Sequence, residues 1–247
     1  MTALLGAELL KLRTLRGTYG YLATVIALAA LIAAGRIGSE DSLGRIGPEF
    51  QASLFSDASG ATTIIALLFG LTIVTAEFRY GTITPALLTT PRRPVFLTAK
   101  LLAGSASGFM LALTAIVVVS SVAVIWLSLI DVPIQLGDAA EPVARMLVAA
   151  LVAGSLGAAY GGIIHAQVPA LVGALIWLLV AEPLLVAVLD VLDVPAVADY
   201  LPAMALFAIA DPQSEGLNFL PATVVGLGHI ALALTAAVVR TERRDIT

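Results

Sequence analysis

The residues Leu101–Leu129 read LLAGSASGFMLALTAIVVVSSVAVIWLSL, and no charged side chain interrupts them. A helix needs about 20 mostly apolar residues to cross a bilayer, and this stretch is long enough to tilt or to project from it. The rest of the chain has the same character. Of its 247 residues 60% are apolar and 12% are charged, and the mean hydropathy is +1.02. A soluble domain has about 25% charged residues, so the sequence predicts an all-α membrane protein.

Five further segments are apolar enough to cross a membrane, which gives six predicted spans in one transmembrane domain over residues 1–247. The predicted spans are about 18–34, 58–76, 101–129, 143–164, 168–189 and 222–239. The segment 1–17 is predicted to be an interfacial helix, because Leu5, Leu9 and Leu12 recur at helical spacing. Lys11 and Arg13 are expected to point elsewhere, toward lipid headgroups. Glu8 interrupts the apolar face.

The basic residues predict the orientation of the chain. Three of the 13 lysines and arginines, Arg36, Arg45 and Arg145, fall on one predicted side of the membrane. The other ten fall on the opposite side: Lys11, Arg13, Arg16, Arg79, Arg92, Arg93, Lys100, Arg240, Arg243 and Arg244. The positive-inside rule makes that side cytoplasmic, so both termini, including the tail 240–247, are expected in the cytoplasm. The excess of arginine over lysine is typical of a GC-rich bacterial genome, which favours a multi-pass protein of the bacterial inner membrane.

Several kinds of chemistry have no motif in this chain. It has no cysteine, no GxxxxGK[ST] loop and no HExxH sequence, so we predict no catalytic residue, no metal site and no bound cofactor. The GSASG sequence at Gly104–Gly108 has alanine where a nucleophile would stand, and its GxxxG spacing favours close helix packing instead. Gly157 and Gly161 repeat that spacing. His229 is interpreted as a packing residue, and His165 as a residue at headgroup level.

Glu182 is the one acidic residue expected deep inside a predicted span. A carboxylate costs at least about 2.5–3.5 kcal/mol there, so it should face the bundle, a subunit interface or a water-filled path. Pro183 follows it and frees a backbone carbonyl one turn earlier. Two interpretations stay open, a polar tie between helices or a part of a substrate or proton pathway.

The loop between the second and third spans, AEFRYGTITPALLTTPRRPVFLTAK at Ala76–Lys100, has a different composition from its surroundings. Gly81 permits a sharp turn. Thr84 and Pro85 then predict an N-cap and a first helical residue, and Pro91 and Pro94 are expected to end this short helix. Arg92 and Arg93 stand at its C-terminal end, where the helix dipole favours cations. Ile83, Leu87 and Leu88 give the helix an apolar face, which could dock on a partner or lie on the bilayer.

This loop resembles the cytoplasmic loop of type-2 ABC exporter permeases, the membrane subunits of ATP-binding-cassette transporters. The matching positions are Glu77, Arg79, Gly81 and Thr82, a short coupling helix at Thr84–Thr90, Arg92 or Arg93, and Lys100 at the start of the third span. The N-terminal AELLKLRTLRG and the six-span topology also resemble the family. His165 departs from it, because an arginine is expected in the turn between the fourth and fifth spans.

The resemblance implies a half-size permease that forms its pathway as a dimer, with a second copy or with a homologous permease. Two separate ATPase subunits would bind ATP and Mg²⁺ and dock on the coupling helices. The export of a hydrophobic drug, lipid or peptide, with drug resistance as one outcome, fits small outer loops and an apolar pathway. The segment 190–221 would hold short re-entrant helices. A proton-coupled secondary transporter that uses Glu182 is the alternative function.

Overall fold

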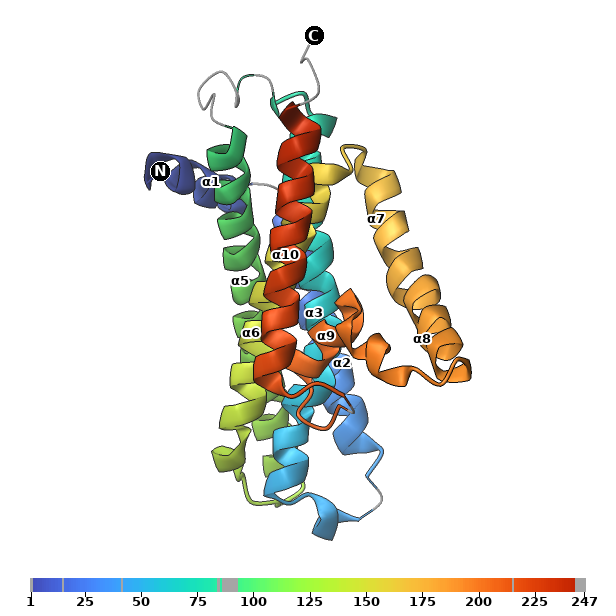
Figure 1. The fold of residues 1–247 in the computed structure, drawn as a ribbon. Coiled ribbons are helices and arrows are strands. Elements are labelled where there is room, and N and C mark those ends of the chain that lie inside the picture. Colours follow the sequence, from blue (N-terminus) through green and yellow to red (C-terminus); the bar gives the residue numbers. More distant parts are fainter. Residues whose placement is uncertain are drawn as a thin grey trace.

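The computed structural model describes residues 2–14, 16–40, 42–83, 85, 93–214 and 216–242. It is all-α, and six long apolar helical segments in it could cross a membrane, as the sequence predicts (Figure 1). Five of them are α2 (Arg16–Gly38), α3 (Pro48–Arg79), α5 (Arg93–Leu129), α6 (Ala140–Ile163) and α10 (Phe219–Glu242). The fifth in chain order consists of α7 (Gln167–Ile176), the π-helical turn η3 (Trp177–Ala181) and α8 (Glu182–Val191).

Shorter elements connect these spans. The helix α1 (Thr2–Thr14) precedes the first span where an interfacial helix was predicted. Three 3₁₀ turns are η1 (Leu43–Arg45), η2 (Leu136–Ala139) and η4 (Pro195–Tyr200). The helix α9 (Pro202–Ala210) follows η4, and both precede α10. The long helices satisfy their backbone hydrogen bonds internally, which a segment that crosses a bilayer must do.

Small residues hold α3, α5 and α6 together at the centre of the bundle. Gly154 of α6 lies directly against Gly70 of α3 and Gly104 of α5, and a methyl group at Gly70 would overlap the Gly154 carbonyl. Gly108 meets the backbone of Ala150, and Gly157 meets that of Leu67. The predicted role of the two GxxxG spacings in close helix packing is therefore confirmed.

Two helices begin well before the spans predicted in them. α3 begins at Pro48, about three turns before the predicted start of the second span at 58, and α5 begins at Arg93, about two turns before the predicted start of the third span at 101. Pro94 was expected to end a short helix but lies in the first turn of α5, where the missing N–H of proline costs nothing. Hydropathy detects the part of a helix that lies in lipid, and a helix that continues beyond the bilayer is not marked by it.

The ends of the bundle differ in charge. α1, the end of α3, the start of α5 and the last turn of α10 lie at one end, which is at the top of Figure 1. Lys11, Lys100 and Arg240 belong to this end. Acidic residues lie near the ends of helices that run away from it: Asp131 follows α5, and Asp190 is in the last turn of α8.

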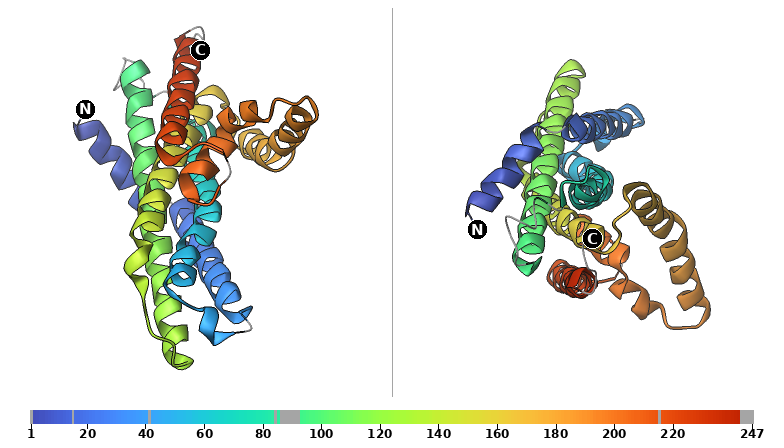
Figure 2. Two further views of the ribbon diagram at one scale, coloured as in Figure 1. Left: turned by 60° about the horizontal axis from the view of Figure 1, so that its bottom comes forward. Right: turned by 90° about the horizontal axis from the view of Figure 1, so that it is seen from above.

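The fifth span stands apart from the other five as an arm (Figures 1 and 2). Only 6% of its most apolar window is buried, against 72% for the fourth span, so most of its surface is free to meet lipid or protein. From the far end of the arm the chain returns inward through η4 and α9, and then α10 begins. α9 packs on α3, α6 and α10, and Ala205, Leu206 and Ile209 in it are buried. The segment predicted to be re-entrant therefore enters the bundle and leaves it on the same side.

Candidate functional site

The loop that resembles a coupling segment begins with a tight turn at the end of α3. Gly81 has φ +68°, a conformation that suits glycine, so the predicted turn is confirmed. Most of the predicted short helix lies outside the described residues. These positions are Thr84 and 86–92, which include Leu87, Leu88 and Arg92. Pro85 is exposed, and Arg93 begins α5.

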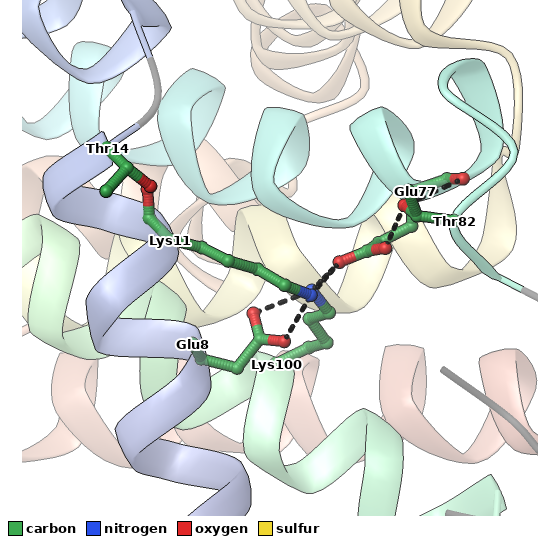
Figure 3. A network of polar contacts seen from close by, with 6 residues as sticks. All are labelled: Glu8, Lys11, Thr14, Glu77, Thr82 and Lys100. Atoms are coloured by element: carbon green, nitrogen blue, oxygen red, sulfur yellow. Dashed lines mark hydrogen bonds and ion pairs between the residues drawn. The ribbon is translucent and has the colours of Figure 1, made fainter. Parts of the chain in front are cut away.

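Four charged residues beside this loop form a closed ring of alternating sign (Figure 3). The Lys100 ammonium lies 2.7 Å from Glu8 Oε2 and 2.6 Å from Glu77 Oε1. The Lys11 ammonium lies 2.7 Å from Glu77 Oε1 and 3.1 Å from Glu8 Oε1. Each charge thus contacts two charges of opposite sign, and we call this cluster the charge ring.

The charge ring is largely shielded from solvent. Lys100 is 1% exposed, Glu8 3% and Glu77 5%, whereas the side chain of Lys11 is 42% exposed. Burial of single charges costs several kcal/mol each, and only well-placed opposite charges offset that cost. The Thr82 hydroxyl also donates to Glu77 Oε2, so a second oxygen of that carboxylate is occupied. The ring is neutral overall, which makes its burial possible.

Lys11 closes the ring on its exposed side. Partial burial disfavours the charged form of Lys11, but hydrogen bonds and Coulombic attraction from Glu77 and Glu8 outweigh it, and they raise the pKa of the ammonium above its ordinary value. Lys11 therefore stays charged throughout the neutral range. The predicted contact of Lys11 with lipid headgroups is wrong, because its ammonium turns inward to the two carboxylates.

The ring joins three helices, two that precede the loop in the sequence and one that follows it. Glu8 and Lys11 belong to α1, Glu77 to the end of α3 and Lys100 to the first part of α5. A cavity of about 360 Å³ borders the ring, and its wall is completed by Leu12, Ile73, Ala76, Tyr80 and Thr82. Beyond the turn, Ile83 packs against Phe96, Leu97 and Ala237, which ties the start of the loop to α5 and α10.

A second set of contacts links the end of α3 to the turn between α6 and α7. Arg79 donates to Gln167 Oε1 over 3.1 Å, and the rings of Phe78 and His165 lie 4.1 Å apart. His165 was interpreted as a headgroup-level residue, and in the structure it also contacts Phe78. The last turn of α3 therefore touches α1, α5 and the start of the fifth span.

Sequence reasoning found part of this site. Glu77, Arg79, Gly81 and Thr82 were singled out as positions that match the family loop, and they lie together at or just after the end of α3. Glu8 was interpreted as a flaw in an apolar face, and its pairing with Lys100 was missed. The sequence held one indication of this pairing. Glu8, Glu77 and Lys100 each stand at the edge of an apolar segment, and charges in such positions need partners.

Glu182 lies at the junction of the π-helical turn and α8 and is completely buried. Its Oε1 accepts hydrogen bonds from the backbone N–H groups of Ala203 (2.6 Å) and Met204 (2.9 Å), in the first turn of α9. Its Oε2 accepts from the Trp177 indole over 2.6 Å. Of the three predicted environments for Glu182, the structure shows the first, because the side chain is buried against the bundle. These contacts are those of a polar tie, since the carboxylate caps α9 and holds it to the fifth span.

An apolar cavity of about 280 Å³ lies between the arm and the bundle, next to this tie. Trp177, Pro202 and Ala203 form the wall nearest to Glu182. The remaining lining residues are Leu67, Tyr160, Ala174, Leu178 and Leu206. In the sixth span His229 Nδ1 lies 3.0 Å from the Val225 carbonyl one turn earlier, as expected for a packing residue.

The comparisons with known proteins add no name to these observations. No protein-family model matches the chain, and no curated protein matches it. Among the described residues no group of three or more metal-ligating side chains comes together. The structure supports a multi-span membrane protein with a buried charge ring at one end and a capped, inward-returning helix beside an apolar cavity.

Proposed function

We propose that this protein is the membrane subunit of an ATP-driven exporter, and that separate ATPase subunits dock on the loop 80–92. The observation that carries the proposal is the charge ring. It joins α1 and the two helices that flank the loop, so a displacement of the loop would be passed to three elements together. A loop that only connected two spans would not need buried charges at its base.

Further contacts support a force-transmitting role for the same end of the molecule. Ile83 connects the loop to α5 and α10, and Arg79 and Phe78 connect the end of α3 to the start of the fifth span. The end that holds the ring also holds most of the basic residues, in agreement with a cytoplasmic position. The sequence of the loop resembles that of type-2 ABC exporter permeases.

The pathway would form in a dimer, with a second copy or a homologous permease. The fifth span favours this arrangement, because few of its apolar residues are buried in the single chain. Transport of a hydrophobic drug, lipid or peptide would fit the apolar cavity beside it. ATP and Mg²⁺ would be bound by the partner ATPase subunits.

The proposal is tested with Leu87→Asp, which places a charge on the predicted apolar face of the loop helix. The complex is purified from native membranes, and the copurifying ATP hydrolysis and the ATP-driven transport are measured. We expect Leu87→Asp to abolish both while the chain still inserts. Val194→Asp is the matched control, since Val194 is exposed at the opposite end of the molecule. Full coupling in Leu87→Asp, or transport by the chain without an ATPase, would contradict the proposal.

A proton-driven carrier that uses Glu182 predicts different behaviour. Its transport would stop with an uncoupler and would be lost in Glu182→Gln. An exporter driven by ATP keeps its transport in the presence of the uncoupler and loses it when ATP is depleted. The three N–H donors around Glu182 favour a tie over a proton carrier, because a carboxyl that cycles between charge states would also need a hydrogen-bond acceptor nearby.

A further inference from the structure

We propose that the apolar cavity between the arm and the bundle binds a lipophilic monocation. The cavity is lined by Leu67, Leu178 and Leu206 together with two aromatic side chains, Trp177 and Tyr160. This inference deepens the proposed function by naming a class of substrate. It depends on that function only for the transport step, because binding itself needs no ATPase.

The first argument is the charge state of Glu182, directly behind the cavity wall. All three of its described partners are N–H donors, and each carboxylate oxygen accepts at least one hydrogen bond from them. A protonated carboxyl would present a hydrogen that needs an acceptor, so this set of contacts is that of an ionised carboxylate. Glu182 is also completely buried, so solvent does not screen its charge.

The second argument is that this charge is only partly compensated. Among the described residues no lysine, arginine or histidine forms an ion pair with Glu182, in contrast with the charge ring. The N-terminus of α9 carries a partial positive charge of about half an elementary charge, which leaves roughly half of the negative charge uncompensated. In a medium of low dielectric constant that residual charge acts over the width of the cavity wall.

The third argument is the aromatic lining. The Trp177 indole N–H donates to the Glu182 carboxylate over 2.6 Å, and Trp177 also lines the cavity, so one side chain contacts both. Cations bind to the faces of tryptophan and tyrosine, and tryptophan is the stronger of the two. Tyr160 lines the same cavity as Trp177. The apolar wall would hold the hydrophobic body of the ligand, and the aromatic faces and the carboxylate its positive charge.

The test compares tetraphenylphosphonium with tetraphenylborate, two ions of nearly the same shape and opposite charge. The permease alone is placed in nanodiscs without ATP. The chain has two tryptophans, and a Trp126→Phe background leaves Trp177 in the cavity wall as its only tryptophan, which is excited selectively over the tyrosines. We expect saturable quenching by the phosphonium, and at least about tenfold weaker binding of the borate.

Two variants separate charge from space in that background. Glu182→Gln removes the charge and should weaken phosphonium binding about tenfold while borate binding stays the same or improves. Ala174→Phe fills the cavity from the loosely packed arm and leaves Glu182 intact, and it should weaken both ions. Val172→Phe is its matched control, because Val172 is exposed on the same helix, and it should change neither.

The proposal is overturned if the parent protein binds the two ions equally, or if Ala174→Phe retains phosphonium affinity. Should Glu182→Gln fail to fold, the ion preference of the parent and the effect of Ala174→Phe still decide. Phosphonium binding by a chain that recruits no ATPase would leave the cavity site standing and refute the exporter. An ATP-coupled complex that binds both ions equally would refute the cavity site and leave the exporter standing.

Discussion

The charge ring and the Glu182 site both bury carboxylates, and they stabilise them in different ways. Glu8 and Glu77 each meet two ammonium groups, so the ring is neutral. Glu182 meets three uncharged N–H donors and keeps part of its charge. A neutral ring can act as a mechanical joint without attracting ions. A residual charge beside an apolar cavity can select a ligand. Under the proposed function, coupling would belong to the end with the charge ring and ligand recognition to the cavity beside Glu182.

The largest effect is expected for Lys100→Met. It removes the buried ammonium that contacts both carboxylates, and it leaves Glu8 and Glu77 with Lys11 alone. Breaking a buried ion pair in this way costs about 3–5 kcal/mol. The free energy of unfolding in detergent measures the loss. Arg36→Met is the control, since the Arg36–Asp57 pair is largely exposed and should contribute less than about 1 kcal/mol. Equal effects of the two substitutions would mean that the ring is no more than a set of surface pairs.

Charge reversal tests whether the four residues act as a ring. Reversal of Glu77 and Lys100 alone (Glu77→Lys with Lys100→Glu) leaves two attractive and two repulsive contacts, so we expect a loss of about 3 kcal/mol. Reversal of all four residues restores every attractive contact and should recover most of the stability and the ATP-driven transport. Recovery with the two-residue reversal alone would show instead that 77 and 100 form an independent pair.

Glu182→Gln probes the other site and should cost about 1–3 kcal/mol, because the new amide group meets the Trp177 N–H as a second donor. Glu182→Leu should cost more, since it leaves three donors without a partner. Hydrogen exchange at the Ala203 and Met204 amides reports the tie directly. Faster exchange there, with unchanged exchange around the charge ring, is the expected pattern. Unchanged exchange in Glu182→Leu would show that α9 does not depend on the carboxylate.

The smallest effect is expected for Lys11→Met, about 1 kcal/mol or less, because Lys11 is partly exposed. The pH dependence is more informative. The pKa of Lys11 is raised above its ordinary value of 10.5, so its contribution to stability is complete below 10.5 and is lost as the pH rises through the higher folded value. Unfolding measured between neutral pH and this range should show that loss in the parent and a smaller one in Lys11→Met. An identical decline in both proteins would show that Lys11 does not contribute to the charge ring.

Much of the fold could be predicted from the sequence, and the long-range contacts could not. Hydropathy located all six spans, and GxxxG spacing marked positions of close helix packing without indicating which helices meet there. The ring was missed because Glu8 and Lys100 are far apart in sequence, and periodicity within one segment carries no information on pairing between segments. Pro183 pointed to an irregular fifth span, but neither it nor Glu182 revealed that the carboxylate caps α9.

The central claim is that the loop 80–92 contacts a separate ATPase. Its most direct measurement is photocrosslinking from benzoylphenylalanine at position 87, with position 194 as the control, followed by mass spectrometry of the adducts. The account predicts an adduct at position 87, absent at 194, to a chain that carries a GxxxxGK[ST] nucleotide-binding loop. Adducts to lipid alone from position 87, in membranes where ATP-driven transport is active, would contradict it.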